Sequence, residues 1–164
     1  MDKLSAADQT AKVWKLAKSI RVAMLVTGHG EAVSARPMYC IIPEGEGDVW
    51  FITARGSGKV TEASADSSAL LTFSNGMDGD HVVMGGRIAA VDDRQKLKAL
   101  WSAGATVYFP KGPDDPAATL LKFTPGSAEY WTGGSGIVAF ALHFAEAKLT
   151  GERPQTGEHG KTAL

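Results

Sequence analysis

The sequence has few cysteines, little net charge and no long apolar run, which are the features that would indicate secretion, a membrane or a strongly charged partner. Its 164 residues include one cysteine, which excludes an intramolecular disulfide. The formal net charge of −1 leaves no global basic field for nucleic acid or an anionic membrane. No apolar run has the length of a membrane span, and no charged segment followed by an apolar one predicts a leader. We therefore expect a cytoplasmic protein that binds neither nucleic acid nor membrane.

Familiar catalytic motifs are also missing. The four histidines are scattered, and no two have the spacing of a metal site. Residues 56–59 read Gly-Ser-Gly-Lys, like the end of a Walker loop, but Thr53 and Val60 stand where that motif needs Gly and Ser or Thr. Residues 28–30 lack the third glycine of a dinucleotide fingerprint, because Val33 occupies its place. No acid–base pair stands out, so we assign no catalytic residue and no metal.

The most informative stretch runs from residue 36 to residue 59. Two apolar runs, 36–42 and 49–53, flank a turn rich in Glu and Gly, which predicts a β-hairpin centred on residues 45–46. That register places Met38 opposite Thr53. It also brings Arg36 to the end of the hairpin from which residues 57–59 continue.

This arrangement predicts a phosphate site. Ser57 is a natural N-cap for a helix over residues 59–65, and a helix start presents free N–H groups. Arg36, Ser57, the Gly58 amide and Lys59 would then converge, with charge-assisted contacts of roughly 1.5–3 kcal/mol each. Pro37 cannot donate to a ladder, so it belongs at an edge, a bulge or a ligand. The alternative interpretation is that Arg36 and Lys59 are solvated surface charges.

The rest of the chain predicts a β-rich protein with few helices. Cys40 lies in an apolar strand and is interpreted as a small buried hydrophobe. Many short strands joined by turns favour a closed β-barrel with helical decoration, in one domain over residues 1–150 with a loose polar tail over 151–164. We expect helices at 4–19 (where Ser5 and Asp8 resemble a capping box), 59–65, 93–101 (capped by Asp92) and 137–148, the last with a strand as second choice. We expect strands at 20–27, 32–42, 49–53, 69–74, 81–91, 118–124 and 127–131. Gly85-Gly86 suggests a bulge or close approach, and residues 104–116 are expected to be irregular.

Several short motifs, in their order and spacing, resemble one known family. The chain is similar to the pyridoxamine-phosphate-oxidase-like FMN-binding split barrels, and within them to the bacterial general stress proteins. The motifs are Arg36-Pro37-Met38, Trp50-Phe51-Ile52-Thr53, Ser57-Gly58-Lys59, Val91-Asp92-Asp93-Arg94, Leu100-Trp101, Phe109-Pro110-Lys111-Gly112, Asp114-Asp115-Pro116 and Glu129-Tyr130-Trp131.

The resemblance implies a β-rich α+β fold, a six-stranded antiparallel split β-barrel with peripheral helices. It also implies a homodimer with one FMN in each of two interface grooves. The resemblance implies that the phosphate is held by Arg36, Ser57, Gly58 and Lys59. It implies that Met38, Ile52 and Thr53 lie along the ribityl chain and ring, with Pro37 beside them. It also implies that His81, at the start of the fifth strand, reaches the flavin, and that Trp101 and Trp131 form walls of the groove. For both tryptophans, packing in the core is an equal alternative.

The sequence is compatible with three functions. The first is an FMN-dependent oxidoreductase linked to stress, although the Arg/His-rich substrate region of the true vitamin B6 oxidases has no counterpart here. The second is a non-catalytic flavin-binding or sequestering stress protein. The third is a split barrel for another ligand such as haem, for which His81 or a histidine of the tail would have to be the axial ligand.

Overall fold

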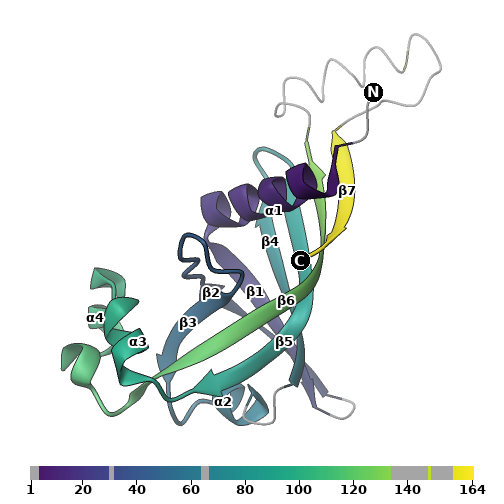
Figure 1. The fold of residues 1–164 in the computed structure, drawn as a ribbon. Coiled ribbons are helices and arrows are strands. Elements are labelled where there is room, and N and C mark those ends of the chain that lie inside the picture. Colours follow the sequence, from purple (N-terminus) through teal and green to yellow (C-terminus); the bar gives the residue numbers. More distant parts are fainter. Residues whose placement is uncertain (1–3, 30–31, 64–66, 134–147, 149–156) are drawn as a thin grey trace.

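The computed structural model describes residues 4–29, 32–63, 67–133, 148 and 157–164. One strongly curved antiparallel sheet carries helices around it (Figure 1). The strands are β1 Val22–His29, β2 Ala32–Tyr39, β3 Val49–Ala54, β4 Ser67–Asn75, β5 Asp80–Val91, β6 Ala118–Thr132 and β7 Glu158–Ala163. The helices are α1 Ala6–Ile20, α2 Gly58–Ala63, α3 Arg94–Ala99 and α4 Ala103–Tyr108, with a 3-10 turn, η1, at Gly112–Asp114.

The order of the strands confirms the split barrel. Neighbours follow β2-β1-β4-β5-β6-β3, which are six strands, and β7 adds a seventh by pairing with β6. The sheet is not closed, so the closed barrel expected from the strand pattern was wrong. Among the described residues, the chain segments at the two ends of this order meet at one isolated bridge, between Ile41 and Trp50. The opening beside this bridge separates β2 from β3.

The predicted hairpin is correspondingly reduced to that bridge. The bridge has the predicted register, but β2 pairs with β1 and β3 pairs with β6. Met38 therefore lies opposite Ala23, and Thr53 lies opposite Thr119. The physical reason is that each strand finds a full-length partner elsewhere, which satisfies more backbone groups than the hairpin would. Pro37 lies in β2 at the edge of the sheet order, where its missing N–H is tolerated.

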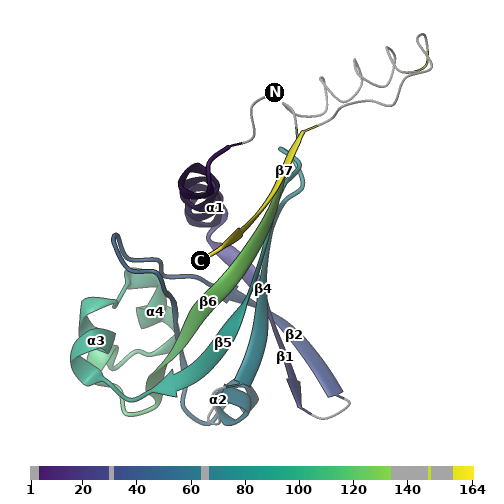
Figure 2. The same cartoon turned by 45° about the vertical axis from the view of Figure 1, so that its right-hand side comes forward.

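The core lies inside the curve of the sheet, because each strand turns alternate apolar side chains inward. In β4 these are Ala69, Leu71 and Phe73, each at most 7% exposed. α1 lies across one side of the sheet and adds Val13 and Ala17 (Figure 2). Ser5 caps α1 as its sequence predicts, accepting a 3.2 Å bond from the Asp8 N–H.

The Gly85-Gly86 pair marks both a bulge and a close approach. Gly86 lies opposite Pro125 and Gly85 opposite Ser127, so Gly126 is the extra residue in β6. β6 is thus one continuous strand, and the predicted break between residues 124 and 127 was wrong. The bulge accommodates a proline that cannot donate to the ladder, which explains why the turn signal at Pro125 does not end the strand.

Other boundaries differ from the expectation. The N-cap of α3 is Asp93, which accepts from the Lys96 N–H at 2.9 Å, whereas Asp92 binds Arg55 at 2.8 Å. Residues 104–116 are not irregular throughout, since they contain most of α4 and the turn η1. The loose tail was wrong for residues 158–163, which form β7 along β6. The predicted helix 137–148 lies outside the described residues except at its last position.

None of the helices in the described part of the chain combines the length and the hydropathy of a membrane span.

Candidate functional site

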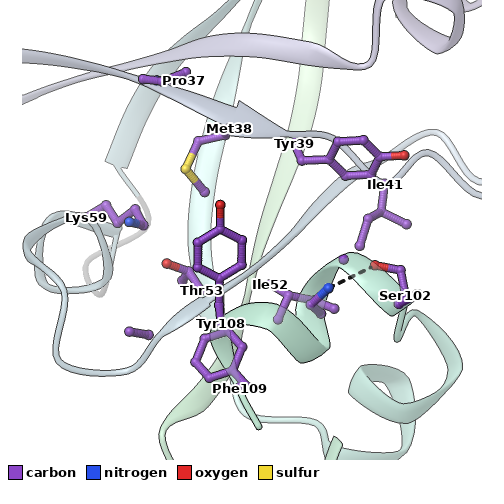
Figure 3. A pocket seen from close by; sticks show the side chains of 14 residues that line it. Pro37, Met38, Tyr39, Ile41, Ile52, Thr53, Lys59, Ser102, Tyr108 and Phe109 are labelled. Atoms are coloured by element: carbon purple, nitrogen blue, oxygen red, sulfur yellow. Dashed lines mark hydrogen bonds between the residues drawn. The ribbon is translucent and has the colours of Figure 1, made fainter. Parts of the chain in front are cut away.

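A cavity of about 860 Å³ opens between β2, β3 and the α4 region (Figure 3). Its volume is in the range of about 300–1,000 Å³ that is usual for small-molecule pockets. It lies beside the opening of the barrel, where the edges of β2 and β3 separate. Five residues that the sequence analysis assigned to a cofactor line it: Pro37, Met38, Ile52, Thr53 and Lys59.

The cavity has one cationic side and a largely apolar remainder. Lys59 is the one charged side chain among its described lining residues. Figure 3 shows Lys59 on one side, with Tyr39, Ile41 and Ser102 on the other. A ligand with an anionic group at one end and an apolar, ring-like body would match this polarity.

Arg36 adjoins the cationic side, although it does not line the cavity itself. It lies in β2 directly before Pro37, and its side chain is 20% exposed. Its Nη2 donates to Glu62 Oε2 of α2 at 2.7 Å. Because Lys59 and Glu62 are three residues apart on α2, they share a face of that helix. The ion pair therefore holds Arg36 against the helix that carries Lys59.

Two polar atoms near this cationic side are buried without a hydrogen-bond partner among the described residues. They are Arg36 Nε and Ser57 Oγ. An unsatisfied buried donor or acceptor costs about 1–3 kcal/mol, so such atoms are expected to meet water or a ligand. The side-chain cap predicted at Ser57 is not made, because its hydroxyl has no partner among the described residues. Its carbonyl instead accepts a backbone bond of the first turn, from the Val60 N–H at 2.9 Å. Gly58 begins α2 directly after it.

Cys40 is a structural residue, as its position in an apolar strand predicted. It is 4% exposed, and burial raises the pKa of its thiol to about 12. A thiol with so high a pKa remains protonated near neutral pH and is a poor nucleophile. Burial and a protonated thiol therefore both disfavour nucleophilic chemistry at Cys40, two residues from the cavity-lining Met38.

His81 and Trp131 lie away from the cavity of their own chain. They face each other across β5 and β6, and His159 of β7 stacks on Trp131 with 5.2 Å between ring centroids. The Nδ1 atom of His81 lies 3.1 Å from Ser74 Oγ. Trp131 is 38% exposed, so this row of side chains lies on the outer face of the sheet.

Trp101 packs behind the cavity wall. Its ring lies 6.1 Å from that of Phe109, which does line the cavity, and its Nε1 donates to Thr106 Oγ1 at 3.1 Å. The small core cluster that it joins also contains Trp50 and Leu97. Trp101 thus supports the wall through Phe109.

Sequence reasoning missed the contribution of α4 and of Glu62. Residues 102–105 and Tyr108 line the cavity, but no element had been predicted at 102–103, and the chain from residue 104 had been expected to be irregular. The available signal was Ser102, whose hydroxyl caps α4 by accepting from the Ala105 N–H at 3.4 Å. For Glu62 the signal was its spacing of three residues from Lys59 within a predicted helix.

The cavity offers few groups for acid–base or metal chemistry. Its described lining contains three titratable side chains, those of Lys59, Tyr39 and Tyr108. Within the part of the chain that the structure describes, no three His, Cys, Asp or Glu residues are grouped to hold a metal ion.

A family model and several solved structures point to the same family of proteins. The sequence model of the family described as pyridoxamine 5'-phosphate oxidase like matches residues 8–155. A structure of a protein described as general stress protein 26, from Jannaschia sp. CCS1, is 32% identical, with a TM-score of 0.81 over 96% of this chain and 99% of that one. A general stress family protein from Xanthomonas campestris pv. campestris is 26% identical, with a TM-score of 0.73 over 82% of this chain and 94% of that one.

Two further relatives are more distant. A general stress FMN/FAD binding protein from Xanthomonas citri is 24% identical, covers 80% of this chain and 93% of its own, and has a TM-score of 0.71, which shows a common fold. Among curated proteins, Protein bli-3 of Neurospora crassa is 24% identical over 113 residues. That match covers 64% of this chain and 54% of the Neurospora protein, so the chain spans about half the length of this relative.

Proposed function

Because the chain belongs to the pyridoxamine 5'-phosphate oxidase-like family, we propose that its cavity binds a flavin, and specifically FMN. The observation that carries the proposal is the pair of unpartnered buried atoms, Arg36 Nε and Ser57 Oγ, beside a cavity with Lys59 on its wall. A phosphate would accept from both of these groups and from the Lys59 ammonium. The FMN/FAD binding ascribed to the Xanthomonas citri protein supports the same ligand class.

The rest of the cavity suits the remainder of FMN. The side chains of Met38, Ile52 and Thr53, with Pro37 beside them, would flank the ribityl chain and the ring. The Gly58 amide would join the phosphate ligands. The largely apolar lining continues from there toward α4, where Tyr108 lines the wall. The preference for FMN over FAD rests on this single phosphate site.

When bound, FMN would supply the redox chemistry, and the protein would bind and orient it and limit access of water. The first proposed function is that of a cytoplasmic oxidoreductase linked to the stress response. The link to stress is supported by the names of similar structures, which are described as general stress proteins. Oxidation of vitamin B6 is not proposed, because an Arg/His-rich substrate region was not found in the sequence. The second form is a flavin-binding protein without turnover, which the scarcity of acid–base groups in the cavity favours.

Retention of flavin tests the site. Purified protein is mixed with FMN and desalted, and its visible spectrum is recorded for wild type, for the Arg36→Ala/Lys59→Ala double variant, and for a Lys15→Ala/Lys161→Ala control that removes two exposed cations elsewhere. We expect flavin to remain on wild type and control and to be lost from the Arg36→Ala/Lys59→Ala variant. A wild type that emerges colourless would refute flavin binding.

Turnover separates the two forms of the proposal. Under anaerobic conditions with excess NADH or NADPH, an oxidoreductase bleaches its bound FMN faster than free FMN reacts with the same donor. Bound FMN that stays oxidised with both donors would favour the non-catalytic form.

We also propose a homodimer. An apolar face crosses β2, β1 and β4, and its residues are 39–73% exposed: Val22, Met24, Val33, Tyr39 and Leu70. Exposed apolar patches of this kind usually mark interaction sites. His81 and Trp131 lie on the same face of the sheet, so in a dimer they would approach the flavin of the partner subunit.

Sedimentation velocity at micromolar concentration checks the dimer. Wild type is expected to sediment as a dimer, and Met24→Glu/Leu70→Glu as a monomer. Val107→Glu serves as the control, because Val107 is 78% exposed on α4, away from this face. A monomeric wild type would contradict the proposal.

A further inference from the structure

Glu62 is an unexpected neighbour for a phosphate site, because a carboxylate repels a phosphate. It lies on α2 one turn after Lys59, and its side chain is 27% exposed. Its Oε1 would be 3.9 Å from a Cβ atom placed on Gly58, so the carboxylate lies over the start of its own helix. The residue is thus next to the segment 57–59 that we assign to the phosphate. Its presence there needs a reason that outweighs the repulsion.

The contacts of Glu62 suggest such a reason. Its Oε2 accepts from Arg36 Nη2 at 2.7 Å and also from the hydroxyl of Thr27 on β1. Thr27 is 2% exposed, so this second contact fixes the carboxylate to a rigid part of the sheet. The end of α2 is held as well, since Ser67 Oγ donates to the Glu62 carbonyl at 2.5 Å. Glu62 is therefore anchored independently of Arg36.

Arg36 has a long, flexible side chain that would otherwise sample many rotamers. The bond to Glu62 uses Nη2 and holds the guanidinium, while Nε stays buried and unpartnered among the described residues. A donor that is held in place before the ligand arrives loses less conformational entropy on binding. The ion pair is only partly buried, and such pairs usually add little to stability, so fold stability alone is a weak reason for it.

We propose that Glu62 is a positioning residue, which orients Arg36 so that its free Nε can bind the phosphate of the ligand. This inference rests on the proposed flavin function. It assigns to Glu62 an effect that operates through Arg36 and depends on the phosphate. It also predicts that the acceptor oxygen of Glu62 is needed and that its negative charge is not.

A double-mutant cycle tests the proposal, with FMN and riboflavin as the two probes. Affinities are measured by flavin fluorescence titration for wild type, Glu62→Ala, Arg36→Ala and the double variant. We expect Glu62→Ala to weaken FMN binding about tenfold, the lower end of the loss seen when the hydrogen-bond partner of a metal ligand is removed. In the Arg36→Ala background the same substitution should have no further effect. Riboflavin has no phosphate, so its affinity should be equal in all four proteins, which also reports that the cavity is folded.

Two conservative variants complete the design. Glu62→Gln keeps an acceptor oxygen without the charge, and should bind FMN at least as tightly as wild type. Glu62→Asp keeps the charge but is one methylene shorter, so it should weaken FMN binding as alanine does. If Glu62→Ala does not fold, Glu62→Asp takes its place in the cycle.

Several results would overturn the positioning role. One is an equal loss of FMN affinity from Glu62→Ala in the wild-type and in the Arg36→Ala background, and another is a loss of riboflavin affinity in parallel with that of FMN. The others are tighter FMN binding by Glu62→Ala, and FMN binding by Glu62→Gln that is as weak as that of Glu62→Ala. Failure of the wild type to bind either flavin would instead remove the proposed function, and this inference with it.

Discussion

Tyr130 is a polar residue that the fold buries, and its partners come from both ends of the chain. It is 1% exposed, and its hydroxyl donates to Glu158 Oε1 at 2.5 Å. The other carboxylate oxygen of Glu158 binds Lys12 Nζ at 2.6 Å, and that ammonium lies 5.3 Å from the centroid of the Tyr130 ring. Burial, and then the hydrogen bond to Glu158, raise the pKa of Tyr130 to about 12. The cluster joins α1, β6 and β7.

This pKa predicts a loss of stability in alkaline solution. A raised pKa means that the folded protein favours the protonated phenol. The contribution of Tyr130 protonation to the free energy of unfolding is therefore complete below the ordinary pKa of 10.0 and disappears as the pH rises toward about 12. We expect the free energy of unfolding to fall over this interval, and to fall less in Tyr130→Phe. Urea unfolding at a series of pH values measures both curves. Equal slopes for the two proteins would contradict the prediction.

At the level of single residues, the sequence identified the residues of the cationic side of the cavity but not their arrangement. Arg36, Ser57 and Lys59 were selected by charge, hydrogen-bonding capacity and position near a helix start. Their exact neighbours, and above all the carboxylate of Glu62, depend on how α2 is placed against β1 and β2. No local pattern contains that placement, because it is set by packing between elements.

Among the elements, β6 shows how a local signal can be overridden. The proline and glycine at its centre predict a turn, yet pairing on both sides keeps the strand continuous through a bulge. The opposite strand makes this possible at Gly86. A Cβ atom there would lie 2.3 Å from the Thr124 carbonyl oxygen and 2.8 Å from Phe123 Cζ.

The neighbouring glycines provide a matched pair of variants. Gly86→Ala forces the backbone of β6 to move, and we expect it to lower the free energy of unfolding by about 3 kcal/mol. At Gly85 the nearest atom to a Cβ is the Ser127 hydroxyl oxygen at 3.2 Å, which can move by rotation. Gly85→Ala should therefore change stability by about 1 kcal/mol or less. Similar denaturation midpoints for the two variants would show that the close approach at Gly86 is unimportant.

The caps of two helices, α1 and α3, were predicted to within one residue. Ser5 was placed correctly, whereas the cap of α3 was assigned to Asp92 instead of Asp93. Two adjacent aspartates have the same capping ability, so sequence cannot choose between them. The choice follows from Arg55, which lies after β3 and occupies both oxygens of Asp92 at 2.8 and 3.2 Å.

For the whole molecule, the final strand has the largest structural effect that sequence reasoning did not anticipate. β7 contains Lys, Glu and His residues and no periodic apolar face, so it resembled a loose tail. In the structure it covers an edge of β6, and the hydroxyl of Thr162 lies 3.2 Å from that of Thr10 on α1. Gly160 allows the close passage over Tyr130, since a Cβ atom there would be 2.5 Å from the ring.

Removal of residues 158–164 tests this role of β7. The truncated protein loses the Glu158 contacts and exposes an unpaired edge of β6, so we expect a lower unfolding temperature and a greater tendency to aggregate. Differential scanning calorimetry and light scattering measure the two effects. Lys161→Ala, a substitution of an exposed side chain within the same strand, should change stability by about 0.5 kcal/mol or less. An unchanged unfolding temperature after truncation would mean that β7 is dispensable.

Local sequence was enough to predict the positions of α1 and of most strands, the bulge, and the residue types that collect around segment 36–59. These features depend on side-chain alternation, capping groups and backbone restrictions, which act over a few residues. Tertiary structure decided that β2 and β3 pair elsewhere and leave the barrel open, that α4 closes the cavity, that Glu62 holds Arg36, and that β7 joins the sheet. Each of these depends on which distant segments satisfy one another's backbone groups and apolar surfaces, and local sequence does not encode that competition.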